Sequence, residues 1–121
     1  MNPIRILIAD DHALLRHGLV MVFALHDDLT VVGEAKNGIE AVRESLRLAP
    51  DVVIMDIMMP KKDGVTATQE IHEKLPTAKV LILTSVSASD GITRALAAGA
   101  SGAVLKNSEN LQQRPQLTQQ S

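Results

Sequence analysis

The chain has 121 residues, of which 45% are apolar and 21% are charged, and this composition is typical of one globular domain. Its net charge of −2 gives no basic surface for nucleic acid or membrane headgroups, and no apolar run approaches the ~20 residues that span a bilayer. The absence of cysteine excludes disulfides and cysteine-ligated zinc. Because the N-terminal stretch also lacks the apolar core of a signal peptide, we expect a cytoplasmic protein that binds neither nucleic acid nor a membrane.

The first half of the chain alternates short apolar runs with segments of helical period. Residues Ile4–Ala9 are mostly aliphatic and end in two aspartates, which predicts a buried strand. Apolar residues recur at helical spacing from His12 to Leu25 and predict a helix, and Leu29–Ala35 read as a second strand. A second helix follows and stops at Pro50. Its predicted apolar stripe consists of Ile39, Val42, Leu46 and Ala49.

The same alternation continues through the second half. A turn at Asp63-Gly64 is predicted to start a third helix that Pro76 closes, and Asp90 is predicted to cap a fourth helix that ends near Gly99. Three further apolar runs predict strands at Asp51–Asp56, Lys79–Leu83 and Ala103–Leu105.

Repeated strand–helix units with wholly apolar strands predict an α/β domain with an open, doubly wound parallel sheet and helices on both faces. Ligand sites in such sheets lie outside the carboxyl ends of the strands. Polar residues lie at the carboxyl ends of four of the predicted strands. These residues are Asp10 and Asp11 after the first strand, Asp56 at the third, Thr84 at the fourth and Lys106 at the fifth. We therefore expect these side chains to converge on one edge of the sheet.

Three carboxylates gathered at one edge repel one another unless a cation lies among them. Oxygen ligands suit a hard cation such as Mg²⁺, which commonly takes one or two carboxylates together with water and phosphate oxygens. The hydroxyl of Thr84 and the ammonium of Lys106 would complete a clamp for a transferring phosphoryl group. An aspartate can itself be the nucleophile in such a transfer.

Because these residues occur in this order along the chain, the sequence resembles the receiver domain of two-component response regulators. Asp10-Asp11, the stretch Asp56–Gly64, Thr84 and Lys106 match, and the resemblance covers residues 4–106. It implies a flavodoxin-like fold with a five-stranded sheet in the order 2-1-3-4-5. We accordingly expect a receiver domain over residues 1–107.

The resemblance also implies a role for each matching residue. Asp56 is the expected nucleophile, which accepts a phosphoryl group from a histidine kinase. Asp11 and Asp56 bind Mg²⁺ directly, Asp10 binds it directly or through water, and Met58 contributes its backbone carbonyl. Lys106 and Thr84 bond the phosphoryl oxygens. Such a domain catalyses only its own phosphorylation and dephosphorylation, so we do not expect a turnover enzyme.

Residues 10–19, residues 31–35 with Asn37-Gly38, and residues 98–102 further resemble the NarL/FixJ branch, also called the LuxR family. Members of that branch usually carry a C-terminal DNA-binding helix-turn-helix, and these 121 residues contain no such domain. The family also places Met58 and Val86 beside the phosphoryl group. Because both are apolar here, we hypothesise that they hinder attacking water and prolong the phosphorylated state.

The sequence departs from the family pattern in two places. Ala103 stands where the family usually has an aromatic residue that couples the site to the output surface. Residues 108–121 offer only Leu111 and Leu117 as large apolar side chains, so we predict a short or degenerate fifth helix followed by a disordered tail. Apolar surface left exposed in this way could drive a homodimer through helix four, strand five and helix five.

Two other functions compete with the receiver. A pseudo-receiver would only bind a protein partner, and the altered position Ala103 and the tail favour it. An aspartate-nucleophile phosphatase usually has a second aspartate two residues after the nucleophile, where this chain has Met58. A nucleotide-binding site is disfavoured because no glycine-rich loop follows the first strand. The four histidines, at positions 12, 17, 26 and 72, are expected to be surface or boundary residues without a ligand role.

Overall fold

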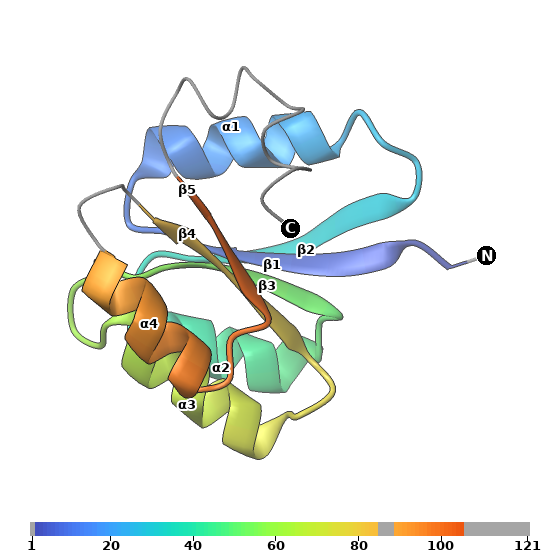
Figure 1. Cartoon of the computed structure of the whole chain (residues 1–121). Coiled ribbons are helices and arrows are strands. Elements are labelled where there is room, and N and C mark those ends of the chain that lie inside the picture. Colours follow the sequence, from blue (N-terminus) through green and yellow to red (C-terminus); the bar gives the residue numbers. More distant parts are fainter. Residues whose placement is uncertain (1, 85–88, 106–121) are drawn as a thin grey trace.

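The computed structural model describes residues 2–84 and 89–105. Within these residues strands and helices alternate along the chain, as Figure 1 shows. The elements are β1 (Ile4–Ala9), α1 (Ala13–Phe23), β2 (Leu29–Ala35), α2 (Gly38–Leu48), β3 (Val52–Asp56), α3 (Gly64–Lys74), β4 (Lys79–Thr84), α4 (Ser89–Ala97) and β5 (Gly102–Leu105). The predicted fifth helix, the predicted tail and the end of the predicted domain at residue 107 lie outside the described residues.

The strands form one parallel sheet in the order β2-β1-β3-β4-β5, which confirms the predicted flavodoxin-like topology. Helix α1 covers one face of this sheet, and α2, α3 and α4 cover the other face (Figure 1). Strand β1 lies between β2 and β3, so the chain winds in opposite directions from it. The carboxyl ends of β1 and β3 therefore form the switch point at which open α/β sheets place their sites.

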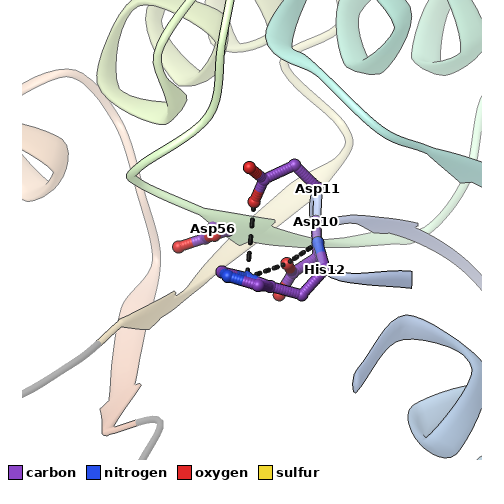
Figure 2. A group of neighbouring side chains, drawn as sticks. All are labelled: Asp10, Asp11, His12 and Asp56. Carbon is purple, nitrogen blue, oxygen red and sulfur yellow. Dashed lines mark hydrogen bonds and ion pairs between the residues drawn. The ribbon is translucent and has the colours of Figure 1, made fainter. Parts of the chain in front are cut away.

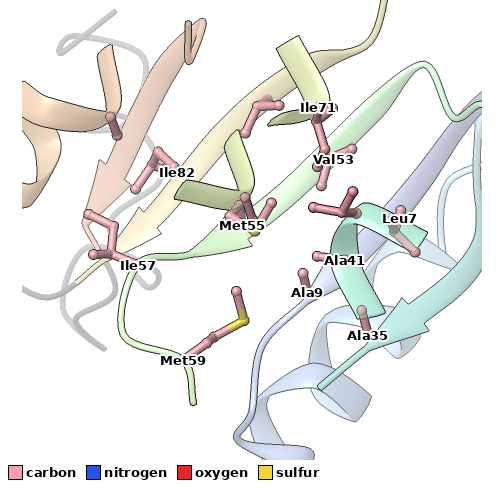
Figure 3. Packing of buried hydrophobic residues seen from close by; sticks show 14 of the residues in the cluster. Leu7, Ala9, Ala35, Ala41, Val53, Met55, Ile57, Met59, Ile71 and Ile82 are labelled. Carbon is pink, nitrogen blue, oxygen red and sulfur yellow. The ribbon is translucent and has the colours of Figure 1, made fainter. Parts of the chain in front are cut away.

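The central strands are apolar on both faces because helices lie above and below them. Leu7, Val53 and Ile82 are fully buried in β1, β3 and β4. Figure 3 shows these side chains packed with Met55 and with Ile71 of α3 in one continuous cluster. This core fixes the three strands whose ends carry the polar residues.

Helix α2 buries its small residues instead of the whole predicted stripe. Ala41 and Ser45 are fully buried, whereas Ile39 and Leu46 are 48% and 45% exposed, so the predicted stripe is wrong at these two positions. Small side chains allow the helix to lie close to the sheet and α3, and the larger aliphatic residues are displaced to its margins. Helix α3 buries Ile71 together with the small residues Ala67 and Thr68.

Helix α1 leaves its side of the sheet only partly covered. None of its residues is buried, and the apolar residue Val22 is 52% exposed. An apolar groove of about 760 Å³ lies between α1 and the strands. Its lining includes Leu19, Val22 and Phe23 of α1 together with Ile6, Ile54, Leu83 and Val104 of the sheet.

The helix ends follow local side-chain chemistry. Helix α3 begins at Gly64, which confirms the helix start predicted at Asp63-Gly64, and the Asp63 carboxylate caps it by accepting a hydrogen bond from the Thr66 amide at 2.8 Å. The prediction for Asp90 is wrong, because α4 begins at Ser89 and Asp90 lies inside its first turn. After α4 the chain turns at Gly99, whose φ of +117° favours glycine. No helix among the described residues is long and apolar enough to cross a membrane.

Candidate functional site

The sheet register brings the carboxyl ends of β1 and β3 side by side. Ala9 pairs with Met55, so Asp10 and Asp56, the next residue along each strand, leave the sheet as neighbours. Both side chains are almost fully buried, with relative exposures of 1% and 3%. Burying two acidic groups next to each other is costly without compensation, which marks this edge as a site.

Asp10, Asp11, His12 and Asp56 form one compact group. Each residue offers a ligand atom, and these atoms all lie within 4.8 Å of one another. Figure 2 shows Asp56 reaching the group from β3, while the other three residues follow the end of β1. The structure therefore brings together the three predicted carboxylates.

The local backbone holds Asp10 in this position. Its Oδ1 accepts a hydrogen bond from the His12 amide at 2.8 Å, which ties the carboxylate to the start of α1. Its carbonyl oxygen accepts a hydrogen bond from Arg16 Nη1 at 2.6 Å. Arg16 is in turn oriented by Glu34, because its Nε donates to Glu34 Oε1 at 2.8 Å. Sequence reasoning did not identify this supporting role of Arg16, which lies one helical turn after His12.

His12 is the member of the group that sequence reasoning missed. Its ring is 65% exposed, as predicted for a surface residue, but Nδ1 lies 3.2 Å from Asp10 Oδ1 and 3.4 Å from Asp11 Oδ1. The prediction that no histidine is spaced as a ligand with nearby carboxylates is therefore wrong for His12. The available signal was adjacency, since His12 directly follows Asp10-Asp11 and its side chain can fold back over them.

The loop after β3 carries Asp56 and Met58. The Met58 amide lies 3.3 Å from Asp56 Oδ1, so the backbone of Met58 approaches the carboxylate while its side chain is 69% exposed. The loop returns to the same place at α3, where the Gly64 amide donates to the Ile57 carbonyl at 2.8 Å. A Cβ atom on Gly64 would lie only 2.1 Å from the Asp56 carbonyl oxygen, so only glycine permits this approach.

An ion pair further anchors this loop. Lys62 of the loop donates a hydrogen bond to Glu70 of α3. The hydrogen bond from Lys62 holds the pKa of Glu70 below its ordinary value, against a smaller opposing effect of burial. The pair links the middle of the loop to the helix that follows it.

Thr84 lies at the carboxyl end of β4, beside the strand that carries Asp56. Its side chain is buried, and its hydroxyl makes no hydrogen bond within the described part of the chain. Thr84 pairs with Leu105, the last residue of β5. The predicted site residue Lys106 and the flanking residue Val86 lie outside the described residues.

The donor set fits a divalent cation. The three carboxylates supply hard oxygen ligands, and the buried hydroxyl of Thr84 lies unsatisfied among the described residues at the same edge. Mg²⁺ would be held by Asp11 and Asp56, with Asp10 bound directly or through water. An acidic pocket at the switch point of a parallel sheet places the chain in the class of flavodoxin-like α/β domains, whose ligand sites lie at the carboxyl ends of the strands.

Comparison with known proteins identifies the family within this class. The family model for the response regulator receiver domain matches residues 6–116, and the chain therefore belongs to this family. The sequence is 43% identical over 105 residues to the transcriptional regulatory protein YhcZ of Bacillus subtilis, covering 87% of this chain and 49% of YhcZ. The chain thus spans about half the length of the curated relatives it matches.

Two solved structures support the same assignment. The signal receiver domain of the putative response regulator NarL from Mycobacterium tuberculosis has a TM-score of 0.83 and 31% identity, covering 88% of this chain and 86% of that one. The CheX–CheY–BeF3–Mg complex from Borrelia burgdorferi has a TM-score of 0.81 and 26% identity, covering 97% and 90%. The first of these agrees with the predicted NarL/FixJ, or LuxR, branch.

Ala103, the departure from the family pattern, lies on the edge strand β5 opposite Ile82. Its side chain is exposed. Ala103 is not one of the four residues that form the compact acidic group.

Proposed function

We propose that this domain accepts a phosphoryl group from a histidine kinase onto the carboxylate of Asp56, in a reaction that requires Mg²⁺. The observation that carries the proposal is the convergence of Asp10, Asp11 and Asp56 from two neighbouring strands. A receiver that modifies only itself needs one nucleophile, one cation site and groups that stabilise the phosphoryl oxygens. The chain supplies residues for each of these tasks.

Asp56 is the proposed nucleophile. One of its carboxylate oxygens forms a bond to phosphorus while the bond between phosphorus and the kinase imidazole nitrogen breaks, and that nitrogen keeps the electron pair. Burial and the neighbouring backbone of Met58 restrict the carboxylate, which favours an in-line geometry. Bound Mg²⁺ neutralises charge on the phosphoryl oxygens and on the acidic pocket.

Thr84 and Lys106 are the proposed groups that bond the phosphoryl oxygens. The buried hydroxyl of Thr84, which has no hydrogen bond within the described residues, is suited to bond a phosphoryl oxygen. Lys106 follows Leu105, the β5 residue that pairs with Thr84. Met58 is proposed to contribute its backbone carbonyl to the cation, which explains why its side chain need not be polar.

The structural comparison supports this chemistry. The Borrelia CheY structure is a complex with beryllofluoride and magnesium, and this chain shares its fold over almost the whole length. Beryllofluoride imitates a phosphoryl group on a carboxylate, so it is the natural probe for Asp56.

Fluorine NMR of the domain with beryllofluoride and Mg²⁺ tests the proposal. The wild-type chain should give bound fluoride resonances that disappear when Mg²⁺ is removed and in Asp56→Asn. Asp63→Asn is a matched control, because Asp63 caps α3 from the same loop and asparagine also caps helices. Loss of the adduct in the control, or an unchanged adduct in Asp56→Asn, would contradict the assignment.

Neither alternative function is favoured over the receiver. A pseudo-receiver does not require three carboxylates to converge on one edge, as they do here. A phosphatase requires an acid or base beside the nucleophile, whereas Met58 occupies the usual position. We therefore also propose that the domain catalyses no turnover reaction beyond its own phosphorylation and dephosphorylation.

The proposal extends to location and assembly. We place the domain in the cytoplasm, where cell fractionation should recover it, and we propose a homodimer through α4, β5 and the fifth helix. Leu96 of α4 is 48% exposed, and the apolar groove reaches Val104 of β5. Analytical ultracentrifugation should show association that Leu96→Gln weakens, and a monodisperse monomer at high concentration would contradict it.

A further inference from the structure

We propose that His12 is an additional ligand of the cation site and gives the pocket a preference for Mn²⁺ over Mg²⁺. The inference rests on the proposed function, because it concerns the same acidic pocket. It goes further by assigning metal selectivity to one residue outside the carboxylate set.

The spacing of the donor atoms carries the inference. His12 Nδ1 lies 3.2 Å from Asp10 Oδ1 and 3.4 Å from Asp11 Oδ1, and dashed lines join the ring to both carboxylates in Figure 2. Adjacent ligands of an octahedral ion with bonds of about 2.1 Å are separated by about 3.0 Å. The two measured separations thus lie close to the edge of a coordination octahedron.

Asp56 supplies the fourth candidate ligand atom, and its distance from the others also fits an octahedral ion. With Asp56 included, all four ligand atoms lie within 4.8 Å of one another. Opposite ligands of the same octahedron are separated by about 4.2 Å, so small side-chain rotations bring the whole set to bonding distance.

The backbone holds the His12 ring near the pocket. The His12 amide donates to Asp10 Oδ1 at 2.8 Å, and the His12 carbonyl accepts from the Arg16 amide at 2.9 Å in the first turn of α1. The ring itself is 65% exposed, so neighbouring side chains do not prevent the rotation that aims Nδ1 at an ion.

Ligand chemistry determines which ion benefits. Carboxylates alone form a hard oxygen site, which Mg²⁺ accepts while keeping several waters. An imidazole nitrogen is a better ligand for transition metals, whose affinities for nitrogen and oxygen sites rise from Mn²⁺ along the series. His12 should therefore raise the affinity for Mn²⁺ and leave the affinity for Mg²⁺ nearly unchanged.

Metal titration of the whole chain tests this assignment. Dissociation constants for Mn²⁺ and Mg²⁺ are measured by calorimetry for the wild type and His12→Phe, which keeps a ring but removes the nitrogens. His17→Phe is the matched control, because His17 is similarly exposed on α1 and contacts Glu34 instead of the pocket. We expect His12→Phe to weaken Mn²⁺ binding at least about tenfold and to change Mg²⁺ binding by less than about twofold.

A spectroscopic measurement separates ligation from mere positioning. Pulsed electron paramagnetic resonance of bound Mn²⁺ should show coupling to a ¹⁴N nucleus in the wild type and in His17→Phe. The coupling should disappear in His12→Phe, and His12→Gln gives a second variant should the phenylalanine disturb the fold. Bound Mn²⁺ without nitrogen coupling in the wild type would overturn the inference.

Different results would exclude the acidic pocket as a cation site and His12 as a ligand. A wild-type chain that binds neither ion would remove the acidic pocket as a cation site, and the proposed function would fail with it. Equal binding of both ions in the wild type and in His12→Phe would leave the receiver function intact and remove His12 as a ligand.

Discussion

Gly64 holds the loop after β3 against the strand that carries Asp56, and replacing it should damage both stability and chemistry. A Cβ atom at this position would lie 2.1 Å from the Asp56 carbonyl oxygen and 2.8 Å from the Ile57 Cα. Real Cβ contacts essentially never fall below 3.0 Å, so the backbones must separate by about 0.9 Å. Both obstacles are backbone atoms, which cannot rotate away as a side chain can.

The change in the free energy of unfolding caused by Gly64→Ala is the balance of a helix-propensity gain and a packing cost. Alanine in a helix is favoured over glycine by about 0.5–1 kcal/mol, but Gly64 lies at the first position of α3, where this gain is smallest. Overpacking costs about 1–3 kcal/mol, and weakening the Gly64–Ile57 hydrogen bond adds about 1 kcal/mol. We therefore expect Gly64→Ala to lower the free energy of unfolding by about 1–3 kcal/mol.

The same displacement should impair phosphorylation. A misplacement of about 1 Å at a reacting group can cost about a hundredfold in rate. The displaced carbonyl belongs to Asp56 itself, the residue whose carboxylate is the proposed nucleophile. We expect the initial rate of phosphorylation by acetyl phosphate to fall by a factor of this order. The folded fraction measured under the same conditions separates this effect from simple unfolding.

Urea denaturation followed by circular dichroism measures the stability change, because the chain has no Trp or Tyr to report by fluorescence. Gly18→Ala is the matched control, since Gly18 lies inside α1 and a Cβ there meets nothing within 4 Å. The control should stabilise the domain by about 0.5–1 kcal/mol. A Gly64→Ala variant that is as stable as the wild type and is phosphorylated normally would refute the close-approach reasoning.

Three further substitutions test separate features. Glu70→Gln should destabilise the domain by at most about 1 kcal/mol at neutral pH, because Lys62 lowers the Glu70 pKa and both side chains are about a quarter exposed. This contribution exists above the ordinary glutamate pKa of about 4.3 and is lost as pH falls through the lower folded pKa of Glu70, so urea melts of the wild type and Glu70→Gln should converge in acid. Thr68→Val should be neutral or stabilising by up to about 1 kcal/mol in urea melts, because the buried hydroxyl has no hydrogen bond within the described residues; a clear loss would reveal a partner. Met58→Asn should accelerate decay of the acyl phosphate by admitting water, and an unchanged decay rate would refute the shielding hypothesis.

Much of the fold could be predicted from local patterns. Buried parallel strands are wholly aliphatic, so the runs Ile4–Ala9 and Leu29–Ala35 were predicted with the bounds that the structure shows. The burial of α2 was harder to predict, because periodicity places Ile39 and Leu46 near the apolar face without measuring how close the helix lies to the sheet. Close packing required Ala41 and Ser45 inside, and no sequence period encodes that distance.

The acidic pocket was predictable for a topological reason. The carboxyl ends of parallel strands share an edge, so Asp10 and Asp56 had to converge once their strands were assigned. The sheet order came from the family resemblance and not from periodicity. The direction of the His12 ring depends on rotation about its own side-chain bonds and on the turn into α1, and residue spacing contains neither.

Locating the phosphoryl group within the chain would show whether Asp56 is the phosphorylated residue. The domain is incubated with a small-molecule phosphodonor and Mg²⁺, the acyl phosphate is trapped by borohydride reduction, and the modified residue is identified by peptide mass spectrometry. We predict one modified residue per chain, Asp56, and no modification when Mg²⁺ is chelated. Modification of a different aspartate, or none in a folded chain with Mg²⁺ present, would contradict it.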